Sequence, residues 1–102
     1  MIQVIAVIQA KPGMRSRVLD FLSANVPAVR AEAGCIEYFA TTDAEGAPAL
    51  QTPLGEDSFV VFERWADMSA FDAHAKAAHV ITYRNNTRDL IASRTVHVLT
   101  AV

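Results

Sequence analysis

The chain has 102 residues, of which 52% are hydrophobic and only 20% are charged. This length suits one domain, residues 1–102, and the apolar content excludes a disordered chain. The net charge is −2 and the Lys and Arg residues are scattered, so the sequence does not predict a basic surface for nucleic acid. The longest apolar runs, such as Val4–Ile8, are too short to span a membrane. A small domain cannot hide this many apolar residues in one core, so we expect a partner or a pocket to cover some of them.

The cysteine content and the N-terminus both favour the cytoplasm. The single cysteine, Cys35, has no partner in the chain for a disulfide bond. The first residues lack the basic region and the cleavage site of a secretory signal peptide. We therefore expect a cytoplasmic protein.

The first two elements are a strand and a helix. Ile2–Ala10 is rich in Ile and Val and apolar on both faces, which is unusual for a strand with one side in water. Lys11–Gly13 ends it, and from Met14 to about Ala31 the apolar residues fall at helical spacing. Pro27 lies inside this helix and predicts a kink or a restart.

Two strands and a long connection follow. Cys35–Thr42 and Ser58–Trp65 are the predicted second and third strands. The connection Asp43–Asp57 contains two prolines, two glycines and four acidic residues, and it is long for a hairpin. Such a connection is either mobile or functional, for example as a lid.

The last part of the chain predicts two helical segments and a strand. Asp67 is a good N-cap for a second helix, a third segment runs from about His79 to Ile91, and Thr95–Val102 forms the final strand. The order β-α-β-β-α-β predicts an α+β, ferredoxin-like sandwich, with a four-stranded antiparallel sheet and helices on one face. Because the first strand is apolar on both sides, we predict a homodimer that packs through the bare sheet face.

The residues that suggest chemistry cluster between the third strand and the two helical segments. Glu63 and Trp65 lie two apart on a strand and so share a face, and His74 lies on the same side of its helix as Phe71. His79 follows His74 by five residues, so it reaches the same space only if the helix ends between them. This spacing does not suit two ligands on one helical turn, and we expect no metal site.

These residues predict an apolar pocket with a base in it. Its expected walls are Tyr38, Phe62, Trp65, Phe71 and Tyr83. A histidine there, His74, can take a proton from a phenol or an enol near neutral pH. Structural interpretations compete: His74 and Trp65 as ordinary core residues, Cys35 as buried packing, and Glu63 as a partner of a nearby arginine.

Four stretches of the sequence together resemble the antibiotic biosynthesis monooxygenase domain family. They are Lys11-Pro12-Gly13, Glu32-Ala33-Gly34-Cys35-Ile36-Glu37-Tyr38, Phe62-Glu63-Arg64-Trp65, and Phe71-Asp72-Ala73-His74 with His79. The resemblance covers nearly the whole chain and implies a dimeric α+β barrel with a cavity in each subunit, next to Tyr38, Trp65, His74 and His79. It also implies oxidation of quinols or phenols with O2 and no cofactor.

Two departures from the family pattern narrow this expectation. The first strand has no asparagine, and His74 stands where heme-degrading relatives have a tryptophan, so heme degradation is not expected. The connection Asp43–Asp57 is longer than in most quinol-oxidising relatives, which bears on the size of the substrate.

The resulting hypothesis is a cofactor-free monooxygenase that acts on a small aromatic substrate and O2. It assigns His74 and Trp65 to catalysis. It assigns substrate binding to Tyr38, Phe62, Glu63, Phe71, His79 and Tyr83. Two alternatives remain open, a non-enzymatic dimer that binds a small hydrophobic molecule, and an isomerase or decarboxylase that needs the base but not oxygen.

Overall fold

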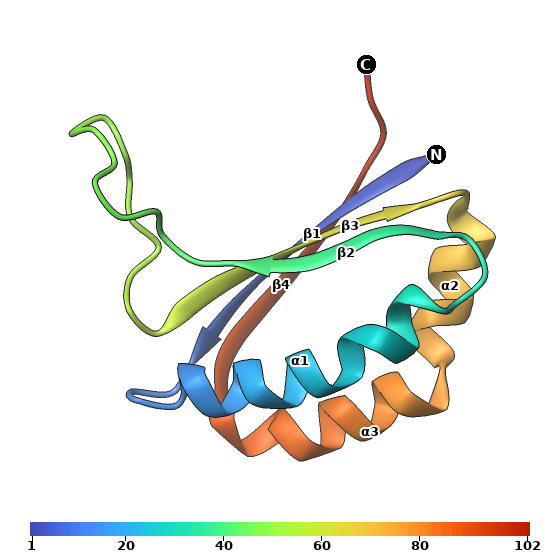
Figure 1. Cartoon of the computed structure of the whole chain (residues 1–102), viewed down its shortest axis with the longest axis horizontal. Helices are drawn as coiled ribbons and strands as arrows, with labels where there is room; N and C mark the ends of the chain where they lie inside the picture. The colour runs from blue at the N-terminus through green and yellow to red at the C-terminus, as the bar shows by residue number, and fades with distance from the viewer.

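The computed structural model describes all 102 residues as one sheet with helices on one side (Figure 1). The elements in chain order are β1 (Ile2–Ala10), α1 (Arg15–Arg30), β2 (Cys35–Thr41), β3 (Ser58–Trp65), α2 (Met68–Lys76), α3 (Ala78–Thr87), the short 3-10 helix η1 (Arg88–Leu90) and β4 (Ile91–Leu99). None of the helices is long and apolar enough to cross a membrane.

The four strands form an antiparallel sheet in the order β2-β3-β1-β4. β1 therefore lies between β3 and β4, although these two strands follow it late in the chain. This arrangement, with all helices on one face, is the ferredoxin-like α+β fold that the element order predicts.

The hydrophobic core lies between the sheet and the helices. Alternate residues of β1, from Ile2 to Ala10, are buried, and their neighbours along the strand are half-buried or exposed. Val18, Leu22 and Val29 of α1 pack against this face. The buried residues of β1 recur at every second position and those of α1 at helical spacing, and both sets face the same core.

Helix α1 is not interrupted at Pro27, so the predicted restart is wrong. The amide of Ala31 donates to the carbonyl of Pro27, and the helix continues to Arg30. Proline removes one helical hydrogen bond, the one that would reach the carbonyl of Ser23. Both residues lie on the exposed side of α1, where that carbonyl can be hydrated.

The last strand begins at Ile91, four residues before the predicted start at Thr95, and ends at Leu99. Ile91 pairs with Ala10, and a register shift follows in the ladder with β1. The polar residues Ser93 and Arg94 hid this part of the strand, because they break the apolar alternation that marks a strand in sequence.

The connection between β2 and β3 is an ordered arm tied at its base. The carboxylate of Asp43 accepts hydrogen bonds from the amides of Leu54 and Gly55, at 2.9 and 3.0 Å, and from the side chain of Gln51 at 3.2 Å. The arm projects beyond the end of the sheet, and its tip lies on the side away from the helices (Figure 1).

Gly34 joins the start of β2 to the start of α2. Its backbone has φ of +82°, a region that favours glycine, and its carbonyl accepts from the amide of Ala66 at 2.8 Å. A Cβ at this position would lie 2.5 Å from the Cβ of Ala70 in α2. The close approach therefore requires the absence of a side chain.

We predict that Gly34→Ala lowers the free energy of unfolding more than Gly13→Ala does. Gly13 also has a positive φ, +77°, but nothing lies within 4 Å of its Cβ position. The control should lose about 1 kcal/mol from backbone strain, and Gly34→Ala about 2–4 kcal/mol because overpacking adds to that strain. Urea unfolding followed by circular dichroism measures both, and equal losses would contradict the steric argument.

Candidate active site

A cavity of about 320 Å³ lies between the sheet and the helical layer. Residues from all four strands, all three helices and η1 line it. They are Ala6, Ile8, Leu22, Asn25, Tyr38, Val61, Glu63, His74, Val80, Tyr83, Arg84, Thr87, Arg88, Ile91 and Arg94. Its size and its mixture of apolar walls with a few polar groups are typical of a small-molecule site.

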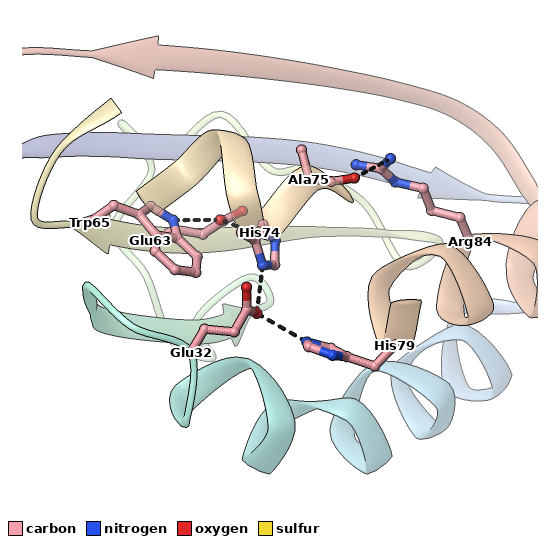
Figure 2. Close-up of polar contacts among 7 residues, drawn as sticks. All are labelled: Glu32, Glu63, Trp65, His74, Ala75, His79 and Arg84. Carbon is pink, nitrogen blue, oxygen red and sulfur yellow. Dashed lines mark hydrogen bonds and ion pairs between the residues drawn. The ribbon is translucent and has the colours of Figure 1, made fainter. Parts of the chain in front are cut away.

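The carboxylate of Glu32 holds both histidines of this region (Figure 2). Its Oε2 atom lies 2.8 Å from Nδ1 of His74 and 3.0 Å from Nε2 of His79. Glu32 lies in the turn between α1 and β2. The two histidines converge because α2 ends at Lys76 and α3 begins at Ala78, with extended backbone at the residue between them.

The second ring nitrogen of His74 faces Glu63. Nε2 of His74 lies 3.8 Å from Oε1 of Glu63, and that oxygen accepts a hydrogen bond of 3.0 Å from the indole N–H of Trp65. Glu63 and Tyr38 are opposite each other on β3 and β2, which brings both side chains to the same face of the sheet. His74 therefore has one nitrogen bound to Glu32 and the other directed toward a second carboxyl group.

Aromatic rings enclose His74, whose side chain is only 7% exposed. The centroid of its ring lies 4.6 Å from that of Trp65, 5.8 Å from that of Tyr38 and 6.2 Å from that of Phe71. These contacts fix the orientation of the imidazole ring. Because water is largely excluded, the charges around the ring interact strongly.

Burial raises the pKa of several acidic groups near the cavity. The pKa of Glu63 is raised by desolvation, although the hydrogen bond from Trp65 and the charge of His74 partly oppose the shift. Desolvation also raises the pKa of Tyr38 and of Tyr83, so both hydroxyls stay protonated. The pKa of the Cys35 thiol is raised as well, first by burial, which disfavours a thiolate nucleophile.

Most of the residues predicted from sequence come together here, in two groups. Tyr38, Glu63, His74 and Tyr83 line the cavity itself. The other three predicted residues that lie near it, Trp65, Phe71 and His79, do not line the cavity but contact His74 or Glu32. They hold the residues that do line it.

Phe62 is not part of this site, and its prediction as a wall is wrong. Side chains alternate across a strand, so Phe62 points to the opposite face of the sheet from Val61 and Glu63. It is 39% exposed and stacks on Phe39 of β2, with ring centroids 5.6 Å apart.

Sequence patterns alone did not identify Glu32 or the three arginines of the cavity, Arg84, Arg88 and Arg94, as site residues. Glu32 is distant in sequence from both histidines, and only the folded chain shows that it binds them. Arg84 and Arg88 carried a detectable signal, since they continue the helical stripe of Val80 and Tyr83 that faces the cavity. Arg94 lies in the part of β4 that the alternation did not reveal.

Comparisons with known proteins agree with this architecture. The sequence profile described as "Antibiotic biosynthesis monooxygenase" matches residues 1–86. The chain is 32% identical over 90 residues to "Putative monooxygenase Rv0793" of Mycobacterium tuberculosis, covering 88% of this chain and 79% of that protein.

Two solved structures superpose on the whole fold. The structure of Rv0793 has a TM-score of 0.81 and 29% identity, covering 99% of this chain and 94% of the other. PA3566 from Pseudomonas aeruginosa has a TM-score of 0.82 and 26% identity, covering 99% and 93% of the two chains. The shared fold and the match over most of the sequence show that this chain belongs to the antibiotic biosynthesis monooxygenase family.

Proposed function

We propose that this protein oxidises a small aromatic phenol or hydroquinone with O2, without a cofactor, and that His74 accepts the phenolic proton. The observation that carries the proposal is the pair of contacts on the His74 ring. One nitrogen is bound by Glu32, and the other faces the cavity beside Glu63.

The contact with Glu32 selects the useful form of the imidazole. A carboxylate only accepts hydrogen bonds, so Nδ1 of His74 donates its proton to Oε2 of Glu32. In neutral imidazole the other nitrogen, Nε2, then carries the free lone pair. Glu32 also stabilises the imidazolium that forms when Nε2 takes a proton, as the acidic member of a catalytic triad does.

Deprotonation is the step that makes the substrate reactive toward oxygen. Ground-state O2 is a triplet and reacts poorly with closed-shell molecules, but an electron-rich phenolate can pass it one electron. In the full reaction a ring C–H and the phenolic O–H are lost, one oxygen atom becomes a quinone carbonyl and the other leaves as water. The substrate supplies all the electrons, so atoms and electrons balance without an external reductant.

The remaining groups position the reactants and handle protons. Nε2 of His74 lies 3.8 Å from Glu63, too far for a direct hydrogen bond, so Glu63, with its raised pKa, would exchange a proton with His74 through a bridging water or substrate hydroxyl. The protonated hydroxyls of Tyr38 and Tyr83 can donate hydrogen bonds to oxygen atoms that gain charge. Trp65 is a positioning residue, because it binds Glu63 and packs on His74 without lining the cavity.

His74→Ala should lower kcat/KM for aromatic phenols by roughly 10²–10⁴-fold, the contribution of a general base. The measurement is O2 uptake with a panel of naphthols and hydroquinones, corrected for uncatalysed oxidation, with ¹⁸O2 to follow the oxygen into the product. Lys76→Ala is the matched control on the same helix, since its exposed ion pair with Asp72 contributes little. Equal rates of O2 uptake for His74→Ala and the wild type would refute the role of His74.

The same assay separates the alternatives. Stoichiometric binding of phenols without O2 uptake would favour a ligand-binding protein. Turnover that continues under argon would favour an isomerase or a decarboxylase, which uses the base alone.

The stability of Glu63→Gln relative to the wild type should be greater at about pH 8 than near pH 4. The folded-state pKa of Glu63 is raised, so ionising its carboxyl group opposes folding, and this penalty is complete only above the folded pKa. A rise of one in the pKa of a group corresponds to about 1.4 kcal/mol of folding free energy. Glutamine stays neutral and keeps an oxygen for the Trp65 indole. Thermal unfolding across this pH range tests the prediction, and a stability difference between variant and wild type that is the same at all pH values would contradict it.

We also propose that the functional unit is a homodimer that packs through the open face of the sheet. Ile5 and Val7 are only half-buried on this face, and Phe39, Phe62 and Leu99 are each about 40% exposed. The arm between β2 and β3 projects past the same face and carries the exposed residues Leu50 and Leu54. A second copy would cover the face and give the arm a surface to contact.

Sedimentation should give a particle of twice the chain mass of 11.1 kDa for the wild type. Phe62→Lys should shift it to a monomer, because a lysine at the stacked Phe39–Phe62 pair would bury a charge in the interface. Ile81→Lys is the matched control, since Ile81 is 47% exposed on the helical layer. A wild-type monomer at micromolar concentration would overturn the proposal.

A further inference from the structure

Three guanidinium groups line the cavity, and no carboxylate pairs with any of them. They come from three separate elements, Arg84 from α3, Arg88 from η1 and Arg94 from β4. Arg84 donates to the backbone carbonyl of Ala75, as Figure 2 shows, and Arg88 donates to the side-chain oxygen of Asn85. The ion pairs of the protein involve other residues.

The lining has one acidic side chain to set against these three cations, the carboxyl group of Glu63. Burial favours its neutral form, and its close contacts are the indole of Trp65 and the ring of His74. The cavity therefore has an excess of positive charge that the protein does not neutralise. Low-dielectric walls concentrate such a field inside a cleft.

The effect of this charge extends across the cavity. Burial raises the pKa of Tyr38, Glu63 and Tyr83, which lie on β2, β3 and α3, and the positive charge of Arg94 opposes that rise in all three. The same charge also adds to the desolvation that lowers the pKa of Arg84. Arg84 and Arg94 are thus close enough to repel each other, and an anion bound beside Arg94 would offset this repulsion.

We infer that the cavity takes an aromatic substrate that carries an anionic group, a carboxylate or a sulfonate, bound by Arg88 and Arg94. The inference rests on the proposed function for the identity of the aromatic part. The planar guanidinium group matches a carboxylate with two parallel hydrogen bonds, which explains arginine rather than lysine at these positions.

The burial of the lining residues gives the substrate an orientation. Arg88 and Arg94 are exposed at the rim of the cavity, whereas the side chains of Glu63 and His74 are each only 7% exposed. The anionic group would lie at the rim, and the phenolic hydroxyl would reach inward to Nε2 of His74. Charge at the rim would thus select the substrate and hold its reactive end against the base.

A matched pair of ligands tests the inference by binding alone. Calorimetric titration with 6-hydroxy-2-naphthoate and with 2-naphthol, under argon, compares an anionic and a neutral phenol of the same ring system, and the acid has its carboxylate and its hydroxyl at opposite ends. The wild type should bind the acid about tenfold or more tightly than the naphthol, because charge-assisted hydrogen bonds are the stronger ones. Equal affinities, or no binding of either ligand, would overturn the inference.

Variants at the rim test which residues are responsible. Arg94→Met and Arg88→Met should each remove most of the preference for the acid, and Arg94→Lys should keep part of it because the charge remains. Arg17→Met, an exposed arginine on α1, is the control and should behave as the wild type does. Thermal unfolding of each variant verifies folding, and a preference that survives both rim substitutions would refute the assignment.

The outcomes separate this inference from the proposed function. Tight binding of the acid without O2 uptake would support the anion site and refute the oxygenase. O2 uptake with neutral phenols and no preference for the acid would support the oxygenase and refute the anion site.

Discussion

The carboxylate of Glu32 is the contact on which the candidate site depends, because it binds two histidines from different helices through one oxygen atom. The side chain of Glu32 is only 13% exposed, and a carboxylate this buried needs partners, since an unpaired buried charge is strongly destabilising. Here the partners are the imidazole rings of His74, which lines the cavity, and of His79, which does not. Gly34, two residues after Glu32, lets α2 approach closely enough for this contact to form. The conformation of the turn at Gly34 is therefore a condition for the contacts of Glu32 in the site.

The cavity contains two chemical environments, a buried aromatic region around His74 and a positively charged rim. Around His74 the aromatic rings exclude water, and burial raises the pKa of the neighbouring Glu63 carboxyl group, which would suit the proposed proton transfer. Toward the rim, Arg88 and Arg94 bring positive charge that would stabilise anions, including the phenolate of the proposed reaction. Positive charge near a bound acidic hydroxyl would lower its pKa, which would ease the transfer of its proton to the base. The two environments therefore act together on the same molecule.

The sheet, the helices and the residues on short repeating patterns could be predicted from the sequence, and the long-range contacts could not. The alternation in β3 and the helical spacing of α2 placed Glu63, Trp65 and His74 on the faces where the structure has them. The same alternation places Phe62 on the opposite face of the sheet, so its prediction as a pocket wall, which rested on its aromatic side chain, was wrong. The role of Glu32 could not be predicted, because it depends on where α1 ends relative to the break between α2 and α3. That relation is set by tertiary packing, which local periodicity does not encode.

Two separate features account for the large number of apolar residues in this short chain. On the helical side of the sheet, apolar residues of β1 and α1 make a core that stops short of filling the space above Ala6 and Ile8, and the cavity remains there. On the other side, no helix covers the half-exposed aromatic pair of β2 and β3. A sheet of four strands needs cover on both faces when both are apolar, and the chain has helices enough for one. The open face is therefore what a second copy would bury, and the cavity is what the first layer of helices creates.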